Sequence, residues 1–223
     1  MVEIKFCGLM REIDAAFASA VGGSYAGVIF AGGPRQLTPE QAAIVLAGAA
    51  PDVQRVGVFG ADFRERIPRA IAAVPLDVVQ LHGDPTVADI RAARALYSGT
   101  IWAAVRVAGN SMPALAAELF GEADAVLLDA LAPGALGAPG ALGALGGTGR
   151  RVEWPMIAGD VARIRAGGMM VLAGGLNGAN VRDAIAALEP DVVDVSSGVE
   201  TAPGLKDHES MTAFAHAVLR SGT

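Results

Sequence analysis

The chain has 223 residues, a formal net charge of −6 at pH 7, 52% hydrophobic residues and only 18% charged residues. So much apolar material with so little charge excludes a disordered chain, and the length suffices for a sizeable core. The acidic balance argues against nucleic acid or an anionic membrane surface as a partner, because both usually require a basic patch.

The positive mean hydropathy of +0.44 does not indicate a membrane protein. The longest uncharged stretch that could be considered as a membrane-spanning helix is 130–149. It contains seven Gly and two Pro, which disfavour such a helix. The N-terminal residues have early charges and no continuous apolar segment, so we expect no signal peptide. A single Cys permits no internal disulfide and no paired-cysteine metal site. We therefore expect a cytoplasmic protein without a metal.

Short β-branched runs alternate with Ala-rich helical patterns along the chain. We expect strands at 3–7, 25–30, 54–59, 77–81, 100–106, 124–129, 169–173 and 191–195. We expect helices near 11–21, 39–49, 62–73, 86–97, 111–120, 155–166, 177–188 and 207–219. The helix start signals are Thr38-Pro39, Asp62, Pro155 as a first helical residue and Asn177 as an N-cap.

Strands that alternate with helices imply parallel pairing through right-handed crossovers. Eight such units in this length leave about 28 residues each, near the minimum for one unit, and eight close a barrel. With no linker or composition break, we expect a single (β/α)8 barrel over 1–223, an α/β fold. A doubly wound open sheet is the alternative, although five or six strands would be more usual for it.

If the fold is a barrel, the chemistry should lie at the carboxyl ends of the strands. Polar and glycine residues do gather at those ends. They are Cys7, Arg35, His82, Arg106, Asp129, Gly174, Gly175, Ser196, Ser197 and Gly198. The residues after the last two strands are small, so that backbone N–H groups can converge on an anion there. Many barrels hold a phosphate in these two loops, and a pair of ordinary turns is the plainer alternative.

Motifs in a fixed order give the chain a resemblance to one enzyme family. They are KFCG at 5–8, GPR at 33–35, VGVF at 56–59, QLHGD at 80–84, LLD at 127–129, GGTG at 146–149, LAGGL at 172–176, VDVSSGVE at 193–200 and PGLKD at 203–207. Together they resemble phosphoribosylanthranilate isomerase of tryptophan biosynthesis. The resemblance implies a (β/α)8 barrel with no metal and no organic cofactor. It implies an Amadori rearrangement that converts N-(5-phosphoribosyl)anthranilate into 1-(2-carboxyphenylamino)-1-deoxyribulose 5-phosphate.

The resemblance assigns roles to the residues at the strand ends. Cys7 matches the family's general base, and Asp129 matches its general acid. Arg35 matches the arginine that binds the anthranilate carboxylate, while His82 and Arg106 are expected to line the substrate pocket. The phosphate is expected at Gly174, Gly175, Ser196, Ser197 and Gly198. Each residue also has a structural interpretation, such as a buried thiol for Cys7 or a turn carboxylate for Asp129.

These roles make demands on the pKa values of the two catalytic groups. A thiol that acts as a base should have a pKa below its usual value of about 8.5. A carboxylic acid that donates a proton near neutral pH needs a raised pKa, through burial or a nearby negative charge.

The alternation of strand side chains permits a further expectation. If Cys7 points inward, Lys5 does so one layer below, and the last strand neighbours the first in a closed barrel. We therefore expect Lys5 to pair with Asp194, because a buried lysine needs a partner. The alternative is that Lys5 extends to the barrel floor.

The sequence departs from the family pattern in places. Gly33 stands where serine is usual, Met10 where threonine is usual, and Glu153 where aspartate is usual before Trp154. The glycine-rich segment 130–149 is either a lid over Asp129 or an insertion without a catalytic part.

Other functions remain to be distinguished. A related isomerase of histidine biosynthesis would need a second phosphate loop, and an indole-glycerol-phosphate synthase would need a lysine at a strand end. A non-catalytic sensor of phosphorylated ligands would need neither Cys7 nor Asp129. A small phosphorylated molecule is the expected partner, and the chain is either a monomer or a homodimer.

Overall fold

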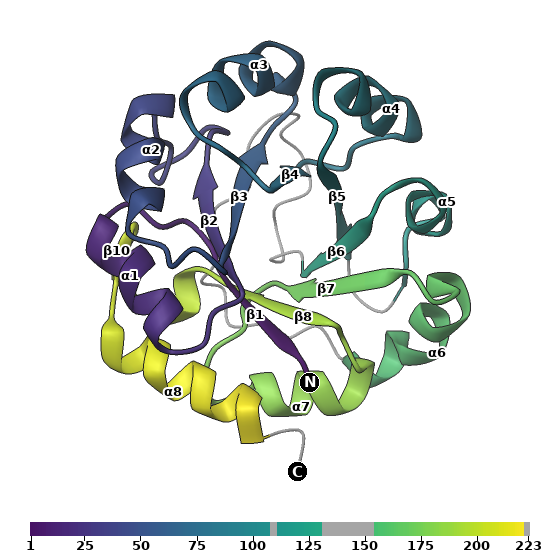
Figure 1. The fold of residues 1–223 in the computed structure, drawn as a ribbon. Helices are drawn as coiled ribbons and strands as arrows, with labels where there is room; N and C mark the ends of the chain where they lie inside the picture. The colour runs from purple at the N-terminus through teal and green to yellow at the C-terminus, as the bar shows by residue number, and fades with distance from the viewer. Residues whose placement is uncertain (108–110, 131–153, 221–223) are drawn as a thin grey trace.

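The computed structural model describes residues 1–107, 111–130 and 154–220, which form a closed barrel of eight parallel strands ringed by helices (Figure 1). The strands are β1 (Glu3–Phe6), β2 (Tyr25–Ile29), β3 (Gln54–Phe59), β4 (Val78–Leu81), β5 (Thr100–Val107), β6 (Ala125–Ala130), β7 (Met169–Ala173) and β8 (Val192–Val195). Each strand pairs with its neighbours in sequence, and β1 pairs with β8 to close the ring. The predicted barrel is therefore confirmed.

Helices cover the outside of the barrel (Figure 1). Within the described residues they are α1 (Glu12–Ala20), α2 (Pro39–Ala47), α3 (Phe63–Ala73), α4 (Val87–Leu96), α5 (Leu115–Glu122), α6 (Trp154–Arg165), α7 (Val181–Leu188) and α8 (His208–Leu219). After β8 the chain forms a short 3-10 turn, η1 (Ser197–Val199), and an antiparallel hairpin of β9 (Glu200–Ala202) and β10 (Leu205–Lys206). None of the described helices is long and apolar enough to cross a membrane.

Alternating strand residues divide the apolar core into two layers. Ile4 and Phe6 of β1 pack outward with helix residues such as Ala15 and Ala18, which are fully buried. Small alanine side chains allow helices to lie close to the strands, which accounts for the Ala-rich helical patterns. The barrel interior is filled by a separate cluster that includes Tyr25 and Trp102, whose rings meet edge to face at 4.9 Å.

Helix starts differ in part from the expectation. Thr38 caps α2 as predicted: its hydroxyl accepts from Gln41 N, and Gln41 Oε1 accepts from Thr38 N. Asp62 makes no side-chain cap on α3 and pairs with Arg66 instead. Pro155 is the second residue of α6, because that helix begins at Trp154.

The prediction of Asn177 as the N-cap of a helix is wrong, because α7 begins only at Val181. Asn177 lies in the preceding turn, where its side chain accepts from Ala179 N. The helix predicted near 111–120 likewise begins later, at Leu115. The family departure at Glu153 and most of the segment 130–149 lie outside the described residues.

We predict that Thr38→Ala lowers the free energy of unfolding by about 1 kcal/mol, because it removes the hydroxyl of a capping box. Denaturant unfolding measures this loss. Asp62→Ala is the matched control and should cost clearly less, since the Asp62 side chain accepts from no backbone N–H of its helix. An equal loss in the two variants would contradict this account of the helix starts.

Candidate active site

The first strand places Lys5 and Cys7 on the inward side of the barrel. Lys5 is fully buried, and its Nζ donates to Asp194 Oδ1 at 3.0 Å. The two residues face each other in the register of β1 and β8, so the predicted pair is confirmed. Cys7 follows directly at the carboxyl end of β1, where its thiol is buried and its backbone N–H donates to Val195 O.

The environment of Cys7 does not lower its pKa. Burial raises the pKa of the thiol, and the neighbouring Lys5 ammonium opposes this only in part, while the Asp194 carboxylate adds to it. The prediction of a lowered pKa is therefore wrong for the free protein. The reason is that the loss of solvation outweighs the nearby positive charge.

Asp129 has the raised pKa that a general acid needs near neutral pH. It lies near the end of β6, and burial, followed by the negative charge of Asp194, raises its pKa to about 7. Going around the ring through β7 and β8, β6 lies three strands from β1, so Asp129 and Cys7 approach the barrel mouth from different sides.

His82 lies next to Asp129, with its Nε2 3.5 Å from Asp129 Oδ2. Burial and the Lys5 charge lower the pKa of His82 to about 4, so the imidazole is neutral at pH 7. The contact is consequently no ion pair. It places a neutral polar group beside a carboxyl that is close to half protonated at neutral pH.

The two arginines expected near the substrate are both held by carboxylates. Arg35 is buried, and its Nε and Nη2 donate to both oxygens of Glu200 at 2.5 to 3.1 Å. Arg106, at the end of β5, donates from its backbone N and its guanidinium to Asp84. Asp84 has a φ of +56°, a conformation unusual for a side-chain-bearing residue.

The loops after β7 and β8 are packed against each other. Gly174 and Gly175 have positive φ values of 92° and 64°. A Cβ on Gly198 would lie 1.9 Å from Leu176 O, so only glycine permits this contact between the two loops. The Ser196 hydroxyl is buried without a hydrogen-bond partner among the described residues.

Two further residues of the site were not predicted, because they lie beyond the strand ends. They are Glu200, which binds Arg35, and Lys206, which binds Glu200. Both lie in the motifs VDVSSGVE and PGLKD, so the signal was present in the sequence. Their side chains are buried although the hairpin that carries them forms a sheet separate from the barrel. Within residues 1–107, 111–130 and 154–220, no group of His, Cys, Asp or Glu could hold a metal ion.

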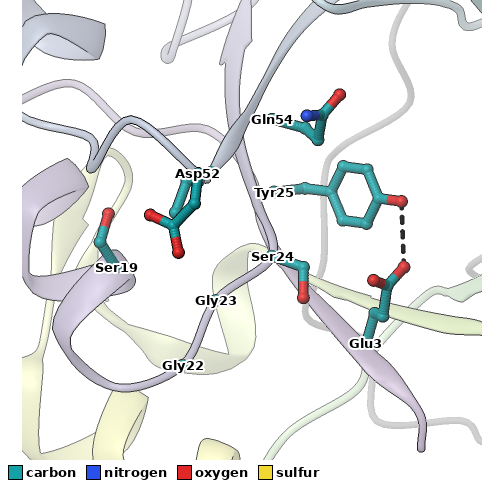
Figure 2. A pocket seen from close by; sticks show the side chains of 9 residues that line it. Glu3, Ser19, Gly22, Gly23, Ser24, Tyr25, Asp52 and Gln54 are labelled. Carbon is teal, nitrogen blue, oxygen red and sulfur yellow. Dashed lines mark hydrogen bonds between the residues drawn. The ribbon is translucent and has the colours of Figure 1, made fainter.

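A pocket of about 380 Å³ lies at the opposite end of the barrel (Figure 2). It is formed where β1, β2 and β3 begin, and the Tyr25 hydroxyl donates to Glu3 Oε2 across one side. Its described lining contains the carboxylates of Glu3 and Asp52 and no Lys or Arg. An anionic ligand therefore has no counter-charge there, and the candidate site remains at the carboxyl ends.

Comparison with known proteins gives one consistent family. The family model described as N-(5'phosphoribosyl)anthranilate (PRA) isomerase matches residues 4–217. A curated N-(5'-phosphoribosyl)anthranilate isomerase of Pseudomonas fluorescens (strain Pf0-1) is 37% identical over 97% of this chain and 98% of the relative. One of Rhodospirillum centenum is 37% identical over 96% of each chain.

Solved structures agree. A phosphoribosyl anthranilate isomerase from Thermotoga maritima superposes with a TM-score of 0.84 at 34% identity, covering 99% of this chain and all of that one. A second isomerase structure, in complex with reduced 1-(o-carboxyphenylamino)-1-deoxyribulose 5-phosphate, has a TM-score of 0.80 at 32% identity, with the same coverage. A third is described as monomers generated from the dimeric T. maritima enzyme, with a TM-score of 0.79 at 33% identity over 99% of this chain and all of that one.

We predict that Asp129→Asn stabilises the fold increasingly as the pH rises from 4 to 7. The folded state holds the proton of Asp129 up to a pKa of about 7, whereas the unfolded chain releases it near 3.8, so the parent loses stability across this window. The neutral amide avoids that loss, and the gain should reach roughly 2–4 kcal/mol near pH 7.

Unfolding in denaturant at a series of pH values tests this expectation. Asp160→Asn, at an exposed carboxylate on α6 that pairs with Arg163, is the control and should show no such trend. A gain for Asp129→Asn that does not change with pH would refute the raised pKa.

Proposed function

The chain belongs to the N-(5'-phosphoribosyl)anthranilate isomerase family, and on that premise we propose that Cys7 is its general base and Asp129 its general acid. The activity is the isomerisation of N-(5'-phosphoribosyl)anthranilate to 1-(2-carboxyphenylamino)-1-deoxyribulose 5-phosphate in tryptophan biosynthesis. The observation that supports the residue assignment is the raised pKa of Asp129, about 7, on a different side of the barrel mouth from Cys7.

The reaction needs two proton-transfer groups. Asp129 donates a proton to the ring oxygen of the aminoaldose, so that the C1–O bond breaks and an iminium forms at C1. Cys7 then removes the proton from C2, and the electron pair of that C–H bond forms the enolamine. Return of a proton to C1 and loss of one from the C2 hydroxyl give the amino-ketose. The atoms balance without a redox partner.

The raised pKa of Cys7 has a consequence for this mechanism. Because the pKa of the thiol exceeds that of Asp129, most singly protonated molecules carry a thiol and a carboxylate. The productive form, a thiolate with a carboxylic acid, is the minor arrangement of the same single proton. Lys5 favours that form, since its ammonium lies beside Cys7 and works against the cost of burying the thiolate.

The ends of the substrate are assigned to the remaining residues. The phosphate is held by Gly174, Gly175, Ser196, Ser197 and Gly198. The Ser196 hydroxyl, which has no hydrogen-bond partner within the described ranges, supports this assignment. The anthranilate carboxylate is bound by the edge of the Arg35 guanidinium that Glu200 leaves unoccupied. His82 and Arg106 line the pocket beside Asp129, and the Arg106 charge opposes the rise in the Asp129 pKa.

The same residues are compatible with more than one assembly and with a cytoplasmic location. All proposed groups come from one chain, so the activity needs no second subunit, and both a monomer and a homodimer are compatible with it. A cytoplasmic location fits a lone catalytic thiol, because a reducing compartment keeps it from oxidation.

We predict that Cys7→Ala and Asp129→Asn each lower kcat by about 10²–10⁴, with little change in KM, because they remove proton transfer and not binding. Steady-state kinetics of the isomerisation measure both constants. Asp160→Asn serves as the control and should keep the parent kcat. Near-parental turnover in either variant would remove that residue from the mechanism.

We predict a kcat/KM that rises with pH up to about 7 and falls again only at alkaline pH. Below pH 7 the pair takes up a second proton and contains no base, whereas at high pH it loses its last proton and contains no acid. In the residual activity of Asp129→Asn, kcat/KM should no longer rise with pH near 7, because the group that titrates there is absent. A parent kcat/KM that declines as the pH rises through 7 would instead require a lowered Cys7 pKa.

A further inference from the structure

Three charged side chains form a buried cluster beside the candidate site. Glu200 lies between Arg35 and Lys206, and its carboxylate accepts from both. The exposed fractions are 3% for Arg35, 3% for Glu200 and 0% for Lys206. A buried charge needs such partners, because each one loses its hydration. The cluster holds two cations and one anion, so it carries an excess positive charge toward which an anionic ligand is attracted.

The contact between Glu200 and Arg35 fixes the plane of the guanidinium. Nε donates to Oε1 at 2.9 Å and to Oε2 at 3.1 Å, and Nη2 donates to Oε2 at 2.5 Å. This is a two-pronged contact along one edge, which leaves the Nη1 side for another acceptor. Glu200 therefore does not compete for the remaining edge of Arg35 but orients it.

The second cation connects the same carboxylate to the loop after β8. Lys206 Nζ donates to Glu200 Oε1 at 2.7 Å and to Ser196 O at 3.0 Å. The hydroxyl of Ser196 is buried and has no hydrogen-bond partner in the described part of the chain. Glu200 is thus hydrogen-bonded directly to Arg35. It is connected to the Ser196 backbone through two hydrogen bonds, both made by Lys206.

Gly8 shows how close the two ends of the cluster lie. A Cβ placed on Gly8 would be 2.7 Å from Arg35 Cδ and 2.9 Å from Ser196 Oγ. Both side chains therefore pack against the backbone that immediately follows Cys7. Any movement of Arg35 or of the β8 loop would change the surroundings of the base.

We propose that Glu200 is a positioning residue, which orients Arg35 toward the carboxylate of the substrate and, through Lys206, holds the Ser196 loop for its phosphate. Glu200 touches neither end of the substrate itself. The inference rests on the proposed function, which assigns the carboxylate to Arg35 and the phosphate to the Ser196 loop.

The test is the kinetics of Glu200→Gln and Glu200→Asp. Glutamine has the size of glutamate but no charge. Aspartate keeps the charge, but its shorter side chain places the carboxylate farther from Arg35 and Lys206. We expect KM to rise about tenfold or more in E200Q, and in the same direction in E200D, with kcat changed far less. Glu65→Gln, at an exposed partner of Arg69, is the matched control and should leave both constants unchanged. If E200Q does not fold, E200D decides the outcome.

A double-mutant cycle with Arg35→Met separates positioning from a general structural role. If Glu200 acts through Arg35, E200Q should raise KM much less in the R35M protein than in the parent. An equal rise in both backgrounds, or an unchanged KM in E200Q and E200D, would overturn the proposal. If R35M itself leaves KM unchanged, the assignment of Arg35 in the proposed function fails and this inference fails with it. If R35M raises KM but the Glu200 variants do not, only the role of Glu200 is lost.

Discussion

The pairing of Lys5 with Asp194 inside the barrel adjusts the protonation of Cys7, His82 and Asp129. An ammonium buried among apolar strands is tolerated only because a carboxylate on the adjoining strand meets it at 3.0 Å. The two charges then act on the groups above them in different ways. Asp194 helps to raise the pKa of Asp129, and Lys5 helps to lower that of His82 and to moderate that of Cys7. Desolvation remains the largest influence on all three, so the pair adjusts a state that burial establishes.

Local patterns were sufficient to predict most of the architecture. Strand positions followed from β-branched runs, and several bounds agree with the structure to within a residue, as for 54–59 and 169–173. The Lys5–Asp194 contact was also predictable, because strand alternation and barrel closure are both rules of geometry. The role of Asn177 could not be predicted from such patterns. A cap depends on where the first helical turn forms, and here a preceding turn uses Asn177 instead.

The electrostatics of the site could not be derived in the same way. The pKa of Cys7 depends on how completely water is excluded by residues from several strands, which no local pattern encodes. The partner of Arg35 lies 165 residues further along the chain, on a hairpin that is not part of the barrel repeat. The candidate site residues lie at successive strand ends, whereas the contacts that orient Arg35 come from a hairpin far along the chain.

Barrel closure also has a consequence for how the enzyme is made. Lys5 and Asp194 are 189 residues apart, and β1 has its second strand partner only when β8 is present. During translation β1 therefore cannot pair with β8, and Lys5 cannot contact Asp194, until almost the whole chain has been synthesised. The contact between Lys5 and Asp194 beside the Cys7 thiol is completed only in that last step. A shortened translation product that lacks β8 would keep Cys7 and Lys5 but would lack Asp194, the carboxylate that Lys5 contacts.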